Sequence, residues 1–238
     1  MYKAHINVLI ACEESQALAT RFNANGFRAF SCDLQDCSGS HPEFHIKGDC
    51  LNLLDGHCFF QTQDKQYHYV NQWDLIIAHP PCTYLTVTGN RWYNVEKYGD
   101  KAIQRLKDRE EAIDFFMRFT KTTCKHVAIE NPVGVMSTIY RKPDQIIQPY
   151  QFGDHHRKAT CLWLKGLPTL SPTEIVEPKV VRINGTSMDE DYCKAWGLPK
   201  EERQRIRSKT YPGIANAIVS QWGAWLKFLI SEEFTETP

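Results

Sequence analysis

Five short, largely apolar runs divide the chain, and each one gives way to polar residues, to proline or to glycine. They cover residues 6–11, 27–32, 74–78, 127–129 and 160–164. A short apolar run without helical periodicity is typical of a strand that is buried on both faces. The pattern therefore predicts five buried strands.

Helical periodicity fills several of the spaces between these runs. The clearest pattern covers residues 101–122, where apolar side chains lie mainly three or four positions apart: Ile103, Leu106, Ile113, Phe116 and Phe119. A shorter helix is expected before Gly26, a residue suited to a helix C-terminus, and further helices over 188–197, 200–207 and 213–230. Strands that alternate with helices predict an α/β fold with a doubly wound, mostly parallel sheet. Residues 34–68 and 165–187 are expected to be irregular.

Polar residues follow four of the predicted strands at the point where each strand ends. They are the elbow at 12–16, Asp33, and the turns at 79–82 and 130–132. Ligands of open α/β sheets bind at the carboxyl ends of the strands. The four segments therefore predict one shared active site at this edge of the sheet.

The segment Pro80-Pro81-Cys82 carries the most specific chemistry. Two prolines fix the backbone and present the next side chain rigidly at the exit of a buried strand. A cysteine held there can act as a nucleophile if its neighbours favour the thiolate. The alternative is a strand-to-loop turn that contains an incidental cysteine.

Glu130, which follows the next strand, supplies a complementary group. A carboxyl group at this position can protonate or hydrogen-bond a ring nitrogen of a substrate, or it can simply cap a turn. Cys82 and Glu130 together suit covalent activation of a pyrimidine: a thiolate adds to C6, an acid engages N3, and C5 becomes nucleophilic enough to accept a methyl group. Cytosine C5 is otherwise a poor nucleophile, so this chemistry needs both residue types.

Composition narrows the class of protein. The chain has 238 residues, and its 28 basic and 28 acidic side chains give a net charge of zero. This balance argues against a protein that wraps nucleic acid without selectivity, because such binding needs many phosphate contacts. A local basic cluster remains, which is either a solvated helix face or a set of phosphate contacts: Lys200, Arg203, Arg205, Arg207 and Lys209. The nine cysteines are odd in number and lack a CxxC pair, so we expect no disulfide framework. Without a membrane-length apolar run or a cleavage signal, the sequence predicts a cytoplasmic protein.

Four residues run C-x4-C-x3-H-x3-H, a spacing loosely typical of zinc sites: Cys32, Cys37, His41 and His45. Cys32, however, lies inside a predicted strand, and the adjacent Asp33 is needed elsewhere. We expect no metal here and keep structural zinc as the alternative.

The pair Pro80-Pro81-Cys82 and Glu130-Asn131, in this order on successive strand ends, resembles the DNA cytosine-5 methyltransferase family. The whole chain looks like the short cytosine methylase-like proteins of bacteriophages and prophages. The resemblance covers most of residues 6–165 and returns at 207–222. It implies a Rossmann-like methyltransferase fold, S-adenosyl-L-methionine as the methyl donor, a flipped or single-stranded cytosine in DNA as the target, and catalytic roles for Cys82, Glu130 and Asn131. If the chain is phage-encoded, it would work in the host cytoplasm.

The resemblance also implies roles for less conspicuous residues. It places the cofactor against the first elbow, the two acids after the second strand, the proline turn and the last helix: Ala11, Cys12, Glu13, Glu14, Ser15, Asp33, Asp49, Pro80 and Asn216. Asp33 matches the acid that binds the ribose, and Asp49 the acid beside the adenine. The segment 151–160 matches a basic motif near the flipped base, which makes Lys158 a catalytic candidate and Arg157 and Thr160 substrate-binding candidates. The elbow departs from the family because it contains no glycine, and Ala215 replaces the glycine of the last motif.

Size is the largest departure from the family. We expect one methyltransferase domain over residues 1–238, with 165–207 as a reduced insertion in place of a target-recognition domain and 208–230 as a helix that closes the cofactor pocket. So short an insertion predicts low sequence specificity. The loop 84–100 interleaves aromatic and basic residues, which suits stacking on an unpaired base, with Arg91 and Trp92 as candidates. A surface lid packed by its own aromatic residues is the alternative.

These observations predict an enzyme that methylates C5 of cytosine in DNA through a Cys82 adduct, with no membrane association and no obligate protein partner. Three alternatives stay open. The substrate is RNA or a free nucleotide; or the chain is an amino-methyltransferase, although His79 and Cys82 flank the prolines where that class carries other residues; or it is a non-catalytic nucleic-acid-binding relative.

Overall fold

The computed structural model describes residues 5–183 and 185–235, together with their side chains except those of 200, 201, 204, 205 and 233–235. The backbone contacts divide the chain into two compact units. The first comprises residues 1–146 and 160–169, and the second comprises 147–159 and 170–238. The following paragraphs treat each unit by itself.

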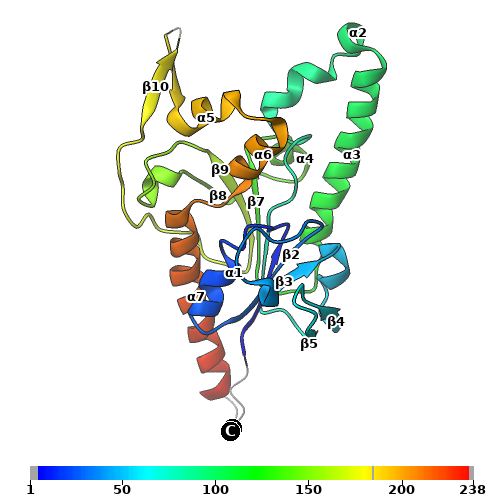
Figure 1. Cartoon of the computed structure of the whole chain (residues 1–238). Helices are drawn as coiled ribbons and strands as arrows, with labels where there is room; N and C mark the ends of the chain where they lie inside the picture. The colour runs from blue at the N-terminus through cyan, green and yellow to red at the C-terminus, as the bar shows by residue number, and fades with distance from the viewer. Residues whose placement is uncertain (1–4, 184, 236–238) are drawn as a thin grey trace. The chain divides into compact units, whose positions relative to one another are not determined.

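A seven-stranded sheet is the centre of the first unit (Figure 1). Its strands are β1 (Asn7–Ala11), β2 (Arg28–Asp33), β3 (His45–Lys47), β6 (Leu75–Ala78), β7 (Val127–Pro132), β8 (Gln145–Ile147) and β9 (Thr160–Lys165). They lie in the order β3-β2-β1-β6-β7-β9-β8. The pairs from β3 to β7 are parallel, whereas β9 runs antiparallel to β7. The expected mostly parallel sheet with helices is therefore confirmed.

The strands of the sheet centre are buried on both faces, as their continuous apolar runs predict. Every residue of β6 is buried, and β1 is buried from Val8 onward. Alternate residues of β1, β2, β6 and β7 join one hydrophobic cluster with Phe116 and Phe119 of a long helix, α3 (Asp100–Thr120). In Figure 1, α3 and the short helix α1 (Ala19–Ala24) lie on different sides of the sheet.

Only the C-terminal half of α3 contributes its apolar face to this cluster. Ile103 and Leu106, which share the predicted apolar stripe, are exposed. The N-terminal part of the helix extends away from the sheet and carries η3 (Val87–Tyr93) and α2 (Val95–Tyr98) beside it (Figure 1). A further short helix, α4 (Met136–Ile139), follows β7.

Residues 34–68 are more regular than the sequence predicts. They contain the edge strand β3, the single turns η1 (Pro42–Phe44) and η2 (Cys50–Leu53), and a hairpin of β4 (Cys58–Gln61) with β5 (Tyr67–Val70). In β4 the residues alternate between buried and exposed. Such half-buried strands lack the continuous apolar run used to find the others, and the prediction of irregular structure was wrong here.

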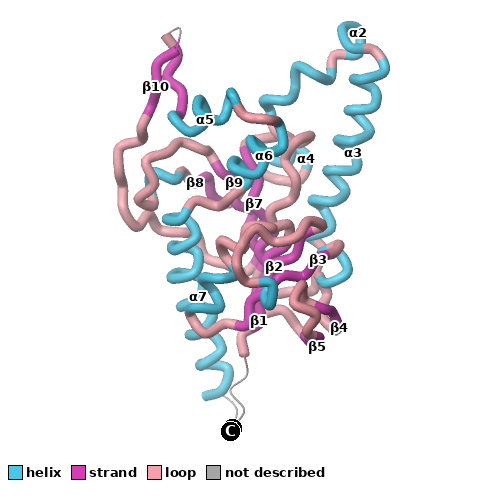
Figure 2. The backbone as a smooth tube through the Cα atoms, in the orientation of Figure 1, coloured by secondary structure: helices cyan, strands magenta, loops and turns pink. Residues whose placement is uncertain are grey.

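The second unit contains a two-stranded sheet and mostly helical segments (Figure 2). The antiparallel strands β10 (Val180–Ile183) and β11 (Thr186–Asp189) fall partly within the span predicted to be irregular. The helical segments are η4 (Pro149–Gln151), α5 (Glu190–Lys194), η5 (Ala195–Gly197), α6 (Lys200–Ser208) and α7 (Pro212–Thr235). Helix α7 begins one residue before the helical pattern at 213–230, but four residues after the start of the closing helix expected over 208–230, and it runs five residues past 230.

Among the described residues, no helix is long and apolar enough to cross a membrane.

Candidate active site at the carboxyl edge of the sheet

The carboxyl ends of β1 and β6 lie side by side, and the chain leaves them in different directions. The strand β6 pairs with β1 up to the Ala11–Ala78 register, and the backbone N–H of His79 then donates to the carbonyl of Ala11 at 3.0 Å. On the other side of β1 the sheet continues into β2 and β3, so the strand order reverses between β1 and β6. Such a switch point forms the usual ligand crevice of an open α/β sheet.

Two side-chain contacts join the proline turn after β6 to the end of β7. Nδ1 of His79 lies 2.8 Å from Oε2 of Glu130, and the two side chains are 12% and 21% exposed. Nδ2 of Asn131 donates to the carbonyl of Pro80 at 2.7 Å. The predicted turns at 79–82 and 130–132 therefore do meet at one edge, although Glu130, Asn131 and Pro132 lie inside β7 rather than after it. Thr160 belongs to the same region, because it pairs with Pro132 across β7 and β9.

Cys82 stands out among the nine cysteines, all of which are described. It is exposed, whereas each of the other eight is buried or half-buried. Its carbonyl accepts the backbone N–H groups of Leu85 at 3.0 Å and Thr86 at 3.1 Å, which closes a tight turn directly after the prolines. The sequence thus presents one thiol to solvent at the edge where Glu130 lies.

Gly134 allows the loops that follow β6 and β7 to approach each other. Thr86 and Gly134 form an isolated antiparallel bridge, and the N–H of Val135 donates to the carbonyl of Leu85. A Cβ atom on Gly134 would lie 2.1 Å from that same carbonyl oxygen, a backbone atom that cannot easily move. Glycine is therefore required where the two loops touch.

The elbow after β1 adopts the backbone conformations that glycine usually provides. Cys12 and Gln16 have φ angles of +60° and +58°, so two non-glycine residues occupy the left-handed region. The carboxylate of Glu13 accepts the N–H groups of Leu18 at 2.7 Å and Ala19 at 3.3 Å, at the start of α1. Burial raises the pKa of the Glu13 carboxyl, and the charge of nearby His79 offsets part of that rise.

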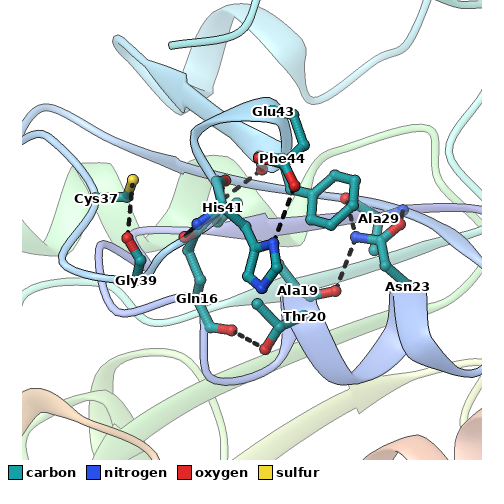
Figure 3. Close-up of polar contacts among 11 residues, drawn as sticks. Gln16, Ala19, Thr20, Asn23, Ala29, Cys37, Gly39, His41, Glu43 and Phe44 are labelled. Carbon is teal, nitrogen blue, oxygen red and sulfur yellow. Dashed lines mark hydrogen bonds and ion pairs between the residues drawn. The ribbon is translucent and has the colours of Figure 1, made fainter. Parts of the chain in front are cut away.

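The loop after β2 also holds the elbow, through hydrogen bonds between the Gln16 side chain and the main chain of His41 (Figure 3). Nε2 of Gln16 donates to the carbonyl of His41 at 2.6 Å, and Oε1 accepts the N–H of His41 at 3.2 Å. A Cβ atom on Gly39 would lie 2.3 Å from Oε1 of Gln16, so the loop passes close to this side chain. The N–H of Ser38 donates to Glu14 as well, whereas the buried Oε1 of Glu14 has no partner among the described residues.

The two acids expected near the cofactor have local partners. An oxygen of Asp33 accepts the N–H of Gln35 at 3.0 Å, directly beyond the end of β2. The carboxylate of Asp49 accepts the N–H of Leu51 at 2.9 Å and so caps η2. Asp33 is the last residue of β2 and Asp49 follows β3, so both lie at the same edge of the sheet, and Asp49 is the more exposed of the two.

Three further thiols lie near these acids, and unlike the exposed Cys82 they are buried or half-buried: Cys12, Cys32 and Cys50. The Sγ atoms of Cys12 and Cys50 are 3.8 Å apart. The hydrogen bond with Cys50, together with burial, raises the pKa of Cys12 well above its ordinary value, and burial likewise raises the pKa of Cys32. Thiols with raised pKa values stay protonated at neutral pH and are poor nucleophiles.

The aromatic loop 84–100 is held by two arginines of α3. Arg105 donates to the carbonyl of Thr83 at 3.1 Å, and Arg109 donates to the carbonyl of Tyr84 at 3.1 Å. The Arg109 guanidinium also lies 3.4 Å from the ring centre of Tyr93. The two residues that follow Cys82 in the chain are therefore hydrogen-bonded to α3.

Arg91 and Trp92 lie at the outer part of this loop. The Arg91 guanidinium stands 4.7 Å above the Trp92 ring, and the rings of Trp92 and Tyr98 are 5.1 Å apart. Trp92 is nevertheless 42% exposed. The loop thus packs partly on its own aromatic residues, while one indole stays accessible for a stacking partner.

The remaining candidates belong to the second unit. The Arg157 side chain donates to the carbonyl of Ser187, Nζ of Lys158 donates to the carbonyl of Arg207 at 3.0 Å, and Asn216 is exposed on α7. In the basic cluster, the side chains of Lys200 and Arg205 lie outside the described residues. Arg207 is exposed and lies 4.8 Å from the ring centre of Tyr192.

The four possible zinc ligands have other partners. Nδ1 of His45 lies 2.9 Å from Oγ of Ser31, Sγ of Cys32 contacts the carbonyl of Gly48, Sγ of Cys37 contacts the carbonyl of Gly39, and Nδ1 of His41 lies 2.9 Å from Glu43. Within the described part of the chain, no group of three or more histidine, cysteine, aspartate or glutamate side chains could hold a metal ion.

Sequence reasoning missed the residues that hold the site together. The sequence marks His79 only as the residue before the prolines and Gln16 only as the end of the elbow at 12–16, and it gives Arg105 and Arg109 no role in the site. Each acts on a partner far away in sequence, 51 positions in the case of His79 and Glu130. Only the position of His79 between a buried strand and two prolines could have drawn attention to it.

Comparisons with known proteins identify no family. No protein-family profile matches the sequence, and no curated protein matches it either. Among solved structures, one similar chain is described as a candidate DNA modification methyltransferase encoded within an E. coli prophage. The TM-score is 0.39 and the identity 14%, over 82% of this chain. The match spans 56% of that chain's length, so this chain covers little more than half of it.

Proposed function

We propose that this protein transfers a methyl group from S-adenosyl-L-methionine to C5 of cytosine in DNA, through a covalent bond between Cys82 and C6. One observation carries the proposal: the only exposed cysteine follows a proline turn that is hydrogen-bonded to Glu130 and Asn131. A nucleophile and a carboxyl group on adjacent strand ends are the two groups that cytosine C5 needs.

The reaction begins at Cys82. Its thiolate attacks C6 and forms the Sγ–C6 bond, while the electrons of the C5–C6 double bond move through C5 and C4 to N3, which takes up a proton from the Glu130 carboxyl. C5 of the resulting enamine is nucleophilic and accepts the methyl group, whose former bonding electrons stay on the donor sulfur. A water molecule then takes the C5 proton, the Sγ–C6 bond breaks to release the thiolate, and the N3 proton returns to Glu130. Because the thiolate must reach the face of the ring, the cytosine must be flipped out of a duplex or be single-stranded.

The edge of the sheet offers groups that suit the methyl donor. In order along the chain, the sheet strands from β3 to β7 lie as 3-2-1-4-5, the order of dinucleotide-binding sheets, and nucleotides bind such sheets where the order reverses. Asp33 at the end of β2 would hold the ribose hydroxyls. The buried, unpartnered Oε1 of Glu14 is an acceptor suited to the ammonium group of the donor. When bound, the donor supplies an electrophilic methyl group.

A mechanism-based trap tests the proposal. With 5-fluorocytosine in the DNA, no proton can leave C5 after methyl transfer, so the enzyme should stay covalently attached and survive denaturing electrophoresis. Peptide mapping should place the bond on Cys82, and full yield should require the methyl donor. Cys82→Ser should form no adduct, because a serine hydroxyl is far less ionised than a thiol.

Cys37→Ser is the matched control, since Cys37 is half-buried and belongs to the loop after β2. It should form the adduct at the wild-type rate. An adduct at another cysteine, or methylation by Cys82→Ala, would refute the mechanism.

A second measurement identifies the substrate and the methylated atom. Duplex DNA, single-stranded DNA and RNA are each incubated with labelled donor, and nucleoside mass spectrometry identifies the product. We expect 5-methylcytosine in DNA, spread over many sequence contexts because residues 165–207 are few for reading a sequence. N4-methylcytosine or N6-methyladenine would favour an amino-methyltransferase instead.

A further inference from the structure

His79 interacts with two carboxylates near the switch point of the sheet. Its Nδ1 atom is 2.8 Å from Oε2 of Glu130 on β7. On the elbow after β1, Glu13 is 4% exposed, and the charge of the same imidazole offsets part of the rise that burial causes in the pKa of its carboxyl. Nε2 of His79 is buried and has no hydrogen-bond partner among the described residues. The backbone of His79 is fixed, because its N–H donates to Ala11 and two prolines follow it.

We propose that His79 holds the proton that Glu130 delivers to the substrate, so that His79 and Glu130 act as one acid. The inference rests on the proposed function and adds to it a positioning residue that also stores a proton. An ordinary glutamate is ionised at neutral pH and has no proton to give, whereas histidine changes its charge in this range. Two groups at hydrogen-bond distance can share one proton, which then belongs to the pair rather than to either residue.

The proton step balances as follows. Before attack the pair carries one exchangeable proton and no net charge, as imidazolium with carboxylate or as imidazole with carboxylic acid. The thiolate forms the Sγ–C6 bond, N3 accepts the proton of the pair, and the negative charge passes from the sulfur to the pair. When the thiolate later leaves C6, the proton on N3 returns to the pair. No oxidant, reductant or other reactant is needed.

The surroundings of the pair favour this arrangement. Glu13 cannot readily take over Glu130 as the partner of His79, because the N–H groups of Leu18 and Ala19 already occupy its carboxylate. Glu130 also acts on Cys161 of β9, where burial and Glu130 together raise the pKa of the thiol. A protonated thiol adds no charge to the site, and Glu13 and Glu130 are two carboxylates that interact with His79.

Two substitutions separate proton storage from positioning. His79→Asn retains an amide nitrogen near the place of Nδ1 but has no proton acidic enough to be transferred at neutral pH, whereas His79→Ala removes both functions. The measurement is the single-turnover rate of adduct formation with 5-fluorocytosine DNA, recorded across the neutral pH range. The rate of the wild type should rise and then fall with pH, as the thiolate forms and the pair loses its proton.

His79→Ala should lower this rate by roughly 10²–10⁴-fold, the range for loss of a positioned acid, with unchanged affinity for DNA. His79→Asn should also be slow at neutral pH, and its rate should recover as the pH is lowered, because Glu130 must then hold the proton alone. The control is His126→Asn at the opposite end of the β6–β7 pair, where Nδ1 contacts the carbonyl of Asp74. It should keep the wild-type profile.

A spectroscopic measurement tests the pair without altering His79. In wild-type protein the imidazole proton shared with Glu130 should give a downfield NMR signal, and Glu130→Gln should remove it. A wild-type rate in His79→Ala, or a slow His79→Asn with an unshifted pH profile, would overturn proton storage. After either of these results, an adduct at Cys82 in the wild-type protein still supports the proposed function. If the wild-type protein forms no adduct, both the proposed function and proton storage by His79 are overturned.

Discussion

At the scale of single residues, the site depends on side chains that hold backbone in place. Gln16 is 1% exposed, has a left-handed backbone, and forms both of its amide hydrogen bonds with the main chain of His41. The carboxylate of Glu13 likewise accepts hydrogen bonds from two backbone N–H groups. These two residues give a glycine-free elbow the fixed shape that a ligand-binding turn needs.

Gln16→Ala should therefore destabilise the protein measurably. The substitution removes the side-chain partners of the N–H and carbonyl of His41, and loss of such part-buried hydrogen bonds costs about 0.5–1.5 kcal/mol each. Urea denaturation should show the free energy of unfolding reduced by about that amount. Gln104→Ala, at an exposed position of α3, should change it little; equal losses in the two variants would contradict the role of Gln16.

At the scale of elements, α3 does two different things. Its C-terminal half packs into the core through Phe116 and Phe119, and its N-terminal half holds the loop after Cys82 through Arg105 and Arg109. The loop carries Trp92, the exposed aromatic candidate for stacking on a base. The same helix thus joins the core to the segment that would meet nucleic acid.

Arg109→Ala should loosen this loop without unfolding the sheet. Arg109 supplies hydrogen bonds to Tyr84 and Asn90 and a cation–π contact to Tyr93. Amide hydrogen exchange within residues 84–98 should accelerate, because the loop loses its main attachment to α3. Exchange in β1 and β6 should stay unchanged. Arg118→Ala, an exposed arginine near the end of the same helix, serves as the control, and unaltered exchange in Arg109→Ala would argue against the clamp.

The sequence predicted those elements whose pattern is continuous. Strands β1, β6 and β7 were recognisable because both faces are buried, and the position of Cys82 and Glu130 at strand ends followed from that. The hairpin β4–β5 was missed because one of its faces is exposed. The His79–Glu130 contact was missed for another reason: pairing between polar side chains depends on the register of β6 against β7, which no local pattern encodes.

At the scale of the whole molecule, the candidate residues divide between the two units. Cys82, Glu130 and Thr160 belong to the first unit, and Arg157, Lys158 and Asn216 to the second. The candidates for the donor, apart from Asn216, also belong to the first unit. A donor that binds the folded state, and not the unfolded state, raises the free energy of unfolding of the protein.

S-adenosyl-L-methionine, or its demethylated product, should raise the melting temperature. At a hundredfold excess over the dissociation constant, the stabilisation should be roughly 2.7 kcal/mol. Asp33→Ala should abolish most of this gain, since Asp33 would hold the ribose. Asp36→Ala tests the same loop at an exposed ion pair with Lys47 and should retain it. A full shift in Asp33→Ala would remove Asp33 from the cofactor site.

The two outer strands of the sheet are very short. β3 and β8 have three residues each, and the carbonyl of His45 in β3 already accepts the N–H of Gln63 at 2.8 Å. A long outer strand offers a row of unpaired backbone groups on which another chain can add a strand and begin to aggregate. Because its edge strands present few unpaired backbone N–H and C=O groups, this sheet is poorly suited to pair with a strand of a second molecule. We therefore expect little aggregation through the sheet edges at high protein concentration.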